Sequence, residues 1–467
     1  MLLLGGLGAL LGVVGGLAAY LVVHLVGLIS NVALLHRVGF DLPNLAHYHP
    51  GWVLVPIAML GGLVVAGLAR WSPVIKGHGI PESIEAILQR QSRIAPRTAV
   101  AKPISAAIAM GTGGPFGAEG PIIVTGGAIG SLLGQLLPVS PAERRILLAT
   151  GAAAGMAGVF ATPVAAVLLA IELLLFERSL RALLPLVLAT GIATALHDML
   201  IGPHPLFAAD SRLHVVGAAL PLFLLLGVAC GLLAVVLSKG LSLVEAGFAR
   251  LPVDDFWHPV IGAAGFALVG LVVPGSLSVG YWAITDAVNG RFLLAAAAAL
   301  FVAKTLSWWV ALGSNTSGGT LAPIFLIAAT MGEMIGIGLS QVFPGAHLQP
   351  AAFALVAMGA TFAAASRALL TGAVFALEVT GAYHLVVPML LAVGVAELVA
   401  EWFLEDRIMT ERLSHRGLAV DFDTVTDPLA ARTTLAGLLA RRRVDEQVQP
   451  PTLGWSRSTR AVPGDDR

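Results

Sequence analysis

Long stretches without a charged side chain are the feature that most restricts how this chain can fold. Six runs contain no Asp, Glu, Lys or Arg: residues 3–34, 52–69, 146–171, 215–238, 305–332 and 379–396. Each run is close to or beyond the roughly 20 apolar residues that a helix needs to cross a bilayer. Charged residues make up only 12% of the chain, against roughly 25% in an ordinary soluble domain. The sequence therefore predicts an all-α integral membrane protein.

Charge and cysteine usage narrow the classes of function. Lys plus Arg and Asp plus Glu both number 27, and no basic stripe indicates a nucleic-acid partner. The single cysteine, Cys230, excludes an intrachain disulfide and a cysteine-bound metal cluster. The 12 histidines show no metal-ligand spacing, so we expect neither a metal nor a cofactor. The run that begins at Leu3 is too long for the apolar part of a signal peptide, and we interpret it as a retained helix.

An internal repeat appears when the sequence is shifted by 202 residues against itself. Lys102 then falls on Lys304, and a slightly shifted match places Glu172 (in VLLAIEL) opposite Glu378 (in AVFALEV). The other matches pair Ala101 with Ala303, Ser105 with Ser307, Gly111 with Gly313, Gly117 with Gly319, Pro121 with Pro323, Ile122 with Ile324, Gly130 with Gly332, and Gly134 with Gly336. Coincidence of glycines in a glycine-rich chain does not explain the matched Lys, Pro and Glu positions. The pattern predicts a duplicated bundle.

Three Gly- and Pro-rich breaks interrupt the apolar sequence. They read GHGIPE at 77–82, GTGGPFGAEGP at 111–121 and GSNTSGGTLAP at 313–323. Each has a proline shortly before an apolar stretch, which suits the first turn of a helix. We therefore expect three helices to begin in mid-protein, where their unpaired N–H groups carry about half a positive charge per helix end. Such ends bind anions without a full cation, so the pattern favours anions over cations.

At these breaks the sequence resembles the chloride channel (CLC) family of anion channels and proton-coupled anion exchangers. GHGIPE is similar to the family's G-S/P-G-I-P loop, GAEGP to its G-R/K-E-G-P loop, and GGTLAP to its G-x-F-x-P loop. The resemblance runs from about residue 50 to 417. It implies a homodimer in the lipid bilayer, one anion pathway per subunit, and a duplicated inverted-repeat bundle of many tilted and interrupted helices.

The predicted organisation has four parts. They are an N-terminal membrane helix and its connection (1–49), a first membrane repeat (50–205), a second membrane repeat (206–417) and a polar tail (418–467). The tail resembles the lead into paired CBS domains at VTDPLA, but roughly 45 residues are too few for such a pair. Basic residues flank the first break and the last span: Arg90, Arg93, Arg97 and Lys102, then Arg407, Arg412 and Arg416. By the positive-inside rule both regions and the tail face the cytoplasm, and we expect a prokaryotic inner membrane.

Glu119 is the acid that most invites a functional interpretation. A carboxylate in the first turn of a helix gains at most about 1–2 kcal/mol from the helix dipole. An ionised acid deep in a membrane costs several kcal/mol unless it has a role. The resemblance implies that Glu119 is a gate, whose carboxylate competes with the transported anion for the same N–H groups. Protonation would release it, so transport would depend on pH.

The resemblance also implies a set of anion-binding positions. These are His78, Gly79, Ile80, Gly117, Ala118, Gly120, Gly319, Thr320, Leu321, Ala322 and Met409. Several depart from the family pattern: His78 stands where many members have serine, and Met409 stands where they have a central tyrosine. A thioether cannot donate a hydrogen bond, whereas His78 can donate one or serve as a capping or packing residue. Leu321 replaces phenylalanine and Ala118 a basic residue, so the anion stays open among chloride, nitrate, bromide and fluoride.

The cytoplasmic proton route separates the main functional alternatives. Exchangers of the family usually carry an acid at the position of Leu173, and leucine cannot relay a proton. This favours an anion channel or an uncoupled transporter, most simply for chloride. A proton/chloride exchanger is the alternative, with Glu172 as a proton route, although Glu172 also fits a structural acid at a helix end. A fluoride-handling relative comes third, and the sequence offers no paired residues for an intramembrane enzyme.

Overall fold

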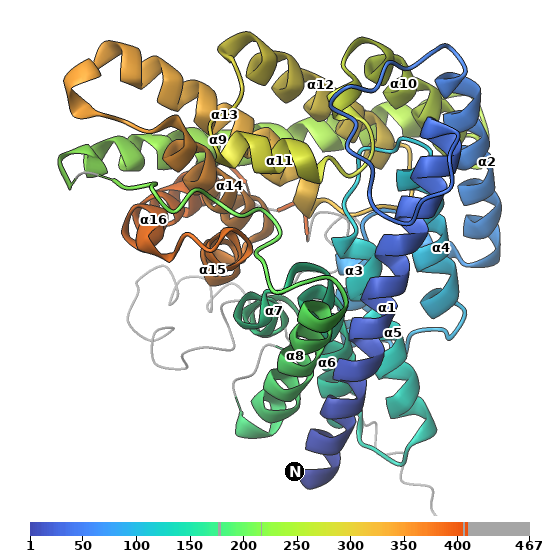
Figure 1. Cartoon of the computed structure of the whole chain (residues 1–467). Helices are drawn as coiled ribbons and strands as arrows, with labels where there is room; N and C mark the ends of the chain where they lie inside the picture. Colours follow the sequence, from blue (N-terminus) through green and yellow to red (C-terminus); the bar gives the residue numbers. More distant parts are fainter. Residues whose placement is uncertain (176–178, 216, 405–406, 410–467) are drawn as a thin grey trace, which may run out of the picture. The chain divides into compact units, whose positions relative to one another are not determined.

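The structure, a computed structural model, describes residues 1–175, 179–215, 217–404 and 407–409. These ranges are helical and contain no β-strand; one isolated antiparallel bridge joins Gly117 to Gly319 within them. The prediction of an all-α fold is confirmed (Figure 1). The predicted polar tail, residues 418–467, lies outside the described residues.

Sixteen α-helices in the described ranges form two series of eight. The first series is α1 (Leu2–Leu35), α2 (Leu54–Trp71), α3 (Ile80–Gln89), α4 (Thr98–Gly111), α5 (Glu119–Leu136), α6 (Pro141–Phe160), α7 (Pro163–Ala170) and α8 (Leu180–Leu200). The second is α9 (Leu220–Ala249), α10 (His258–Val272), α11 (Tyr281–Val288), α12 (Leu294–Gly313), α13 (Leu321–Val342), α14 (Pro350–Ser366), α15 (Leu369–Thr380) and α16 (Val386–Phe403). A long helix opens each series and the two shortest helices take its third and seventh places. The predicted duplication is therefore visible in the order and lengths of the helices, and α2 packs on α10 where the series meet (Figure 1).

Seven helices in the described part of the chain are long and apolar enough to cross a membrane: α1, α2, α8, α9, α12, α13 and α16. Large apolar side chains stand on their outer faces, among them Leu21, Leu225 and Trp402, which are 66%, 66% and 88% exposed. Soluble monomers rarely show large continuous apolar patches, whereas lipid tails accept such side chains. The prediction of an integral membrane protein is confirmed.

The uncharged run at 146–171 does not form a single span. Helix α6 ends at Phe160, Ala161 adopts φ 53°, and α7 begins at Pro163. Proline has no N–H to donate, and it disfavours helical backbone in the residue before it. The run therefore holds two helices whose ends lie inside the protein, which the composition of the run did not indicate.

Two buried lysines explain the strongest match of the repeat. Lys102 on α4 donates to two backbone carbonyls of the turn before α3, at 2.8 and 2.7 Å. Lys304 on α12 does the same in the turn before α11, at 3.1 and 2.8 Å. Backbone carbonyls at membrane depth need partners from within the protein, and each ammonium supplies them. Lys102 is fully buried, so it carries no information about which side faces the cytoplasm.

Two glutamates cap helices of the opposite series. The Glu172 carboxylate, beyond α7, accepts from the N–H groups of Leu370 and Thr371 at 3.0 Å each and from the Thr371 hydroxyl at 2.6 Å, at the start of α15. The Glu378 carboxylate, on α15, accepts from two backbone N–H groups at the start of α7, at 3.1 and 2.8 Å. A carboxylate at a helix N-terminus satisfies unpaired donors and suits the helix dipole. The matched glutamates of the repeat thus join the two series.

Helices α5 and α6 cross at glycines that leave no room for a side chain. A Cβ atom built on Gly126 would overlap the carbonyl oxygen of Gly151, and a Cβ atom on Gly151 would overlap that of Gly126. Membrane helices have no hydrophobic driving force between them, so small residues and close packing hold them together. This contact fixes α5, and with it the position of Glu119 at its start.

We expect Gly151→Ala to lower the free energy of unfolding by about 1–3 kcal/mol, because the added methyl group must push α5 and α6 apart. Gly191→Ala on α8 is the matched control, since open space surrounds its Cβ position; it should be neutral or stabilising by up to about 1 kcal/mol. Thermal unfolding in detergent measures both. Equal effects of the two changes would contradict the close α5–α6 contact.

Candidate functional site

Three helices begin at the breaks that the sequence predicts. Helix α3 starts at Ile80, α5 at Glu119 and α13 at Leu321, and none of these three starts has a side-chain cap. Gly79, just before α3, has φ 96°, which lies in the left-handed region that favours glycine. The first N–H groups of each helix have no intrahelical partner and carry partial positive charge. The prediction of three helix starts is confirmed.

Backbone hydrogen bonds bring the three breaks together. Gly117 and Gly319 exchange N–H···O bonds of 3.2 and 3.0 Å. The Gly318 N–H donates to the carbonyl of Gly77 at 3.4 Å. Since Gly117 belongs to the first series and Gly319 to the second, this junction forms only when the two series pack.

The predicted anion-binding residues of the three breaks are all buried at this junction. They are His78, Gly79, Ile80, Gly117, Ala118, Gly120, Gly319, Thr320, Leu321 and Ala322. A Cβ atom on Gly120 would overlap the carbonyl oxygen of His78, so the start of α5 touches the loop before α3 directly. The structure thus places these residues together, and their contact with an anion stays a prediction.

The Glu119 side chain lies over the junction. A Cβ atom on Gly117 or Gly319 would meet its carboxylate oxygens, which explains why both positions are glycine. Glu119 is 1% exposed, and neither carboxylate oxygen has a hydrogen-bond partner in the described residues. The positive groups that act on it are its own backbone N–H, the Ala322 N–H at the start of α13, and the Lys304 ammonium. A buried carboxylate without partners is costly, and it stands where helix ends would attract an anion.

A fourth helix begins close to this junction, and the sequence analysis missed it. Helix α11 starts at Tyr281 after Gly280, whose φ is 73°, just as α3 starts after Gly79. The preceding segment, SLSVGYW at 276–282, lacks the Gly-x-Gly and the proline of the 77–82 break. The available signal was the register of the repeat, because Gly280 follows Gly79 by 280 − 79 = 201 residues, one less than the 202-residue offset.

Met409 closes the described part of the chain and is buried. The N–H of its neighbour Ile408 donates to the carbonyl of Ala365 at 3.2 Å, near the end of α14. This hydrogen bond fixes the backbone just before Met409. Contact between Met409 and the anion stays a prediction.

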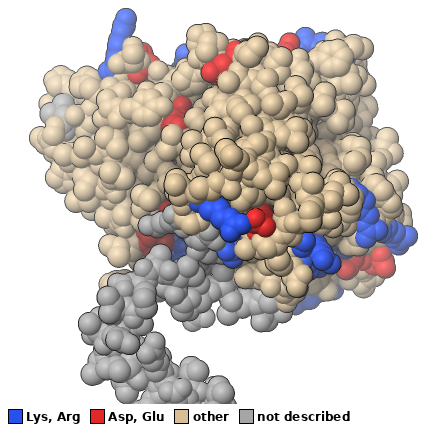
Figure 2. Space-filling view, turned by 90° about the horizontal axis from the view of Figure 1, so that it is seen from below, with Lys and Arg blue, Asp and Glu red and all other residues tan. Residues whose placement is uncertain are grey.

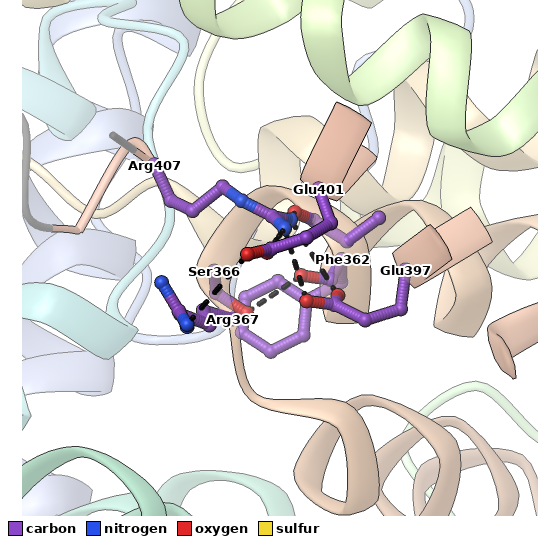
Figure 3. A network of polar contacts seen from close by, with 7 residues as sticks. Phe362, Ser366, Arg367, Glu397, Glu401 and Arg407 are labelled. Carbon is purple, nitrogen blue, oxygen red and sulfur yellow. Dashed lines mark hydrogen bonds and ion pairs between the residues drawn. The ribbon is translucent and has the colours of Figure 1, made fainter. Parts of the chain in front are cut away.

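An ion network anchors the same segment (Figure 3). Arg407 pairs through Nη2 with Glu397 at 3.0 Å and with Glu401 at 2.8 Å, both on α16. It also donates to the backbone carbonyl of Ala364. Glu401 lies 3.9 Å from Arg367, so two acids face two bases. The Arg407 side chain is only 1% exposed, so its charge depends on these partners.

The basic residues used to orient the chain fall into separate groups. The three arginines of residues 90–97 are exposed, and Figure 2 shows Lys and Arg side chains grouped on the face that it draws. Arg407 is buried like Lys102, and Arg412 and Arg416 lie outside the described residues. Orientation therefore depends on the segment 90–97 and stays a prediction.

We expect Arg407→Ala to lower the free energy of unfolding by about 3–5 kcal/mol, because it removes the buried cation and leaves Glu397 and Glu401 facing each other. Arg291→Ala is the control: this arginine pairs with Asp286 at 2.9 Å while its side chain is 63% exposed. Its loss should cost no more than about 1 kcal/mol. Thermal unfolding in detergent compares the two variants, and similar losses would show that the Arg407 network contributes no more than a surface pair.

The fold and site define a duplicated membrane bundle whose interrupted helices meet at a buried carboxylate. The sequence model of the family described as voltage gated chloride channel matches residues 60–401. This match covers more than half of the chain. The chain therefore belongs to this family, and the resemblance stated from the sequence is confirmed.

Individual relatives cover most of the chain. The chain is 29% identical over 427 residues to the H(+)/Cl(−) exchange transporter ClcA of Vibrio campbellii, across 88% of this chain and 89% of the relative. It is 29% identical over 355 residues to ClcA of Yersinia pestis, across 74% and 73%. A solved slow cyanobacterial Cl−/H+ antiporter superposes with a TM-score of 0.77 at 27% identity, across 88% and 96%. A CLC-type fluoride/proton antiporter, with a TM-score of 0.73 at 20% identity across 86% and 95%, shows likeness of fold alone.

Proposed function

We propose that the chain moves chloride across a membrane in exchange for protons, with Glu119 as the gate that both ions share. The observation that supports this most directly is the Glu119 carboxylate, which is buried where interrupted helices of both series meet and has no hydrogen-bond partner among the residues that the structure describes. The relatives that are named H(+)/Cl(−) exchange transporters support the same function. The transported anion therefore takes the place that the carboxylate now holds.

The site attracts an anion mainly through helix ends. Each helix N-terminus contributes partial positive charge from backbone N–H groups, and the Lys304 ammonium, held by two carbonyls, adds to the field at Glu119. When ionised, the Glu119 carboxylate lies over Gly117 and Gly319 and keeps an anion out. When a proton neutralises it, the helix ends attract it less and an anion displaces it. Proton and anion thus use one place in turn, which links their movements.

Passive conduction is the second candidate, and Leu173 is the observation that favours it. Leu173 is buried and cannot carry a proton at the position where exchangers of the family usually have an acid. The comparisons favour exchange over the channel interpretation that this residue suggested. We infer that water carries protons between the cytoplasm and Glu119. Fluoride stays a third candidate because His78 replaces the usual serine.

We also propose that two copies form a homodimer in a bacterial cell membrane, with segment 90–97 and the tail on the cytoplasmic side. Membership of the family supports the homodimer, and the relatives from Vibrio and Yersinia support the bacterial membrane. The exposed arginines of segment 90–97 support the orientation through the positive-inside rule.

Glu119→Gln tests the shared gate. The protein is reconstituted in liposomes loaded with chloride, with the membrane potential held at zero, while internal pH and chloride loss are recorded. For the unchanged chain, chloride that leaves brings protons in, so internal pH falls. Because glutamine cannot take up a proton, the variant should lose proton uptake down to the level of protein-free liposomes, and its chloride flux should no longer depend on pH.

Glu143→Gln is the matched control for this experiment. Glu143 also lies in the first turn of a helix, α6, but at the surface, where it pairs with Arg181. This variant should keep both fluxes and their pH response. A Glu119→Gln variant that still takes up protons would overturn the gate. Chloride flux without proton uptake in the unchanged chain would establish the channel or uncoupled alternative, and a chain that moves only fluoride would redirect the assignment to that ion.

Glu172→Gln tests whether Glu172 carries protons or holds α15 in place. An amide keeps one acceptor oxygen of the two, so part of the cap on Leu370 and Thr371 is lost. We expect about 1–3 kcal/mol less stability and an unchanged ratio of protons to chloride. Glu378→Gln, in the corresponding cap on α7, should behave alike. Loss of proton uptake in Glu172→Gln alone, with chloride flux intact, would make Glu172 the proton carrier.

A further inference from the structure

We propose that the Tyr281 hydroxyl is a hydrogen-bond donor of the anion site, which the Glu119 carboxylate and the transported anion accept in turn. The proposal extends the function proposed above and rests on it. It adds a binding residue from the fourth interrupted helix, α11, to the backbone N–H groups of the other three. Neither the breaks in the sequence nor the family resemblance assigned this residue a role.

The position of Tyr281 is well defined by its surroundings. It is the first residue of α11, directly after Gly280 in the left-handed region. Its ring makes an edge contact with Phe207 at 5.3 Å between centroids and a tilted contact with Phe160 at 6.2 Å. Aromatic contacts of this kind favour one ring orientation. The hydroxyl is therefore held in a fixed direction.

The hydroxyl lies near the start of α5, where Glu119 is. The Tyr281 hydroxyl oxygen is buried and faces the backbone N–H of Ala118, and the Glu119 carboxylate lies within electrostatic reach of it. The hydroxyl and both carboxylate oxygens are without hydrogen-bond partners in the described residues. Buried polar groups in native proteins are nearly always paired. The Tyr281 hydroxyl and the buried Glu119 carboxylate therefore indicate a binding site. A small movement of the Glu119 side chain, or a bound anion, would give the hydroxyl its missing acceptor.

The composition of the site explains why a hydroxyl is needed here. His78 and Met409 stand where the family resemblance expects a serine and a tyrosine, so two hydroxyl donors are missing. The chain has four tyrosines. Tyr383 is exposed, Tyr20 stacks on His24, and Tyr48 lies in the segment between α1 and α2. Among these four tyrosines, Tyr281 is the one whose hydroxyl lies within electrostatic reach of the Glu119 carboxylate.

Tyr281 also borders a cavity. The ring lines a space of about 260 Å³ between α1 and α8, together with His24, Asp41 and His197. At about 30 Å³ per water molecule, this space has room for several waters or a hydrated anion. Tyr281 therefore borders this cavity as well as the gate.

Tyr281→Phe tests the proposal, because it removes the hydroxyl and keeps the ring. Chloride binding is measured by calorimetry on the full chain in detergent, with Glu119→Gln in both samples so that no carboxylate competes. A hydrogen bond to a charged group is worth about tenfold to a hundredfold in affinity, so Tyr281→Phe should weaken chloride binding by that factor. In liposomes the same variant should raise the chloride concentration for half-maximal flux more than it lowers the maximal flux.

Two comparisons separate this role from a structural one. Tyr383→Phe removes a hydroxyl from an exposed tyrosine and should leave chloride affinity unchanged. In a second measurement that keeps the hydroxyl, 3-fluorotyrosine placed at 281 should show a ¹⁹F signal that shifts on chloride titration with the calorimetric dissociation constant. Equal chloride affinity with and without the Tyr281 hydroxyl, or a ¹⁹F signal that ignores chloride, would overturn the proposal. An unchanged chain that neither binds nor moves chloride would instead overturn the proposed function itself.

Discussion

The pair of backbone hydrogen bonds between Gly117 and Gly319 is the interaction on which the rest of the structure depends. A chain in a bilayer must satisfy every backbone polar group from within the protein, and an interrupted helix breaks that rule at each interruption. Here two interruptions, one from each series, satisfy each other, which is possible only because the chain is duplicated. What is left unpaired is the set of first-turn N–H groups, and those of Glu119 and Ala322 act on the Glu119 carboxylate.

Around the junction, charged side chains also supply hydrogen bonds to backbone groups that interrupted helices leave unpaired. Lys102 and Lys304 satisfy the carbonyls of the turns before α3 and α11, and Glu172 and Glu378 satisfy the N–H groups at the starts of α15 and α7. Each of these charged side chains therefore takes over a hydrogen-bonding task that an uninterrupted helix would perform by itself. Four buried or half-buried charges in apolar sequence thus have a structural cause, and no such cap explains the position of Glu119.

Glu119 differs from the helix-capping acids in its hydrogen bonds, and this difference supports the proposed function. A carboxylate that caps a helix, such as Glu172, has several donors, whereas the Glu119 carboxylate has no hydrogen-bond partner among the described residues and lies against glycines. The proposed gate rests on this difference: a proton that removes the charge of Glu119, or an anion that takes its place, would displace it. Among the described residues the Tyr281 hydroxyl has no hydrogen-bond partner either. An ion bound as proposed would supply the partner that both groups lack.

The sequence by itself determined the membrane class, the duplication and three of the helix starts, because bilayer thickness, proline chemistry and glycine conformation act over a few neighbouring residues. It also placed Glu119 at the start of a helix. Tertiary structure decided the rest: that Ala161 ends a helix inside an uncharged run, that Lys102 and Arg407 are buried, and that Tyr281 lies within electrostatic reach of Glu119. These facts arise from contacts between segments far apart in the chain, and local sequence patterns contain no information on which distant segment supplies a missing hydrogen-bond partner.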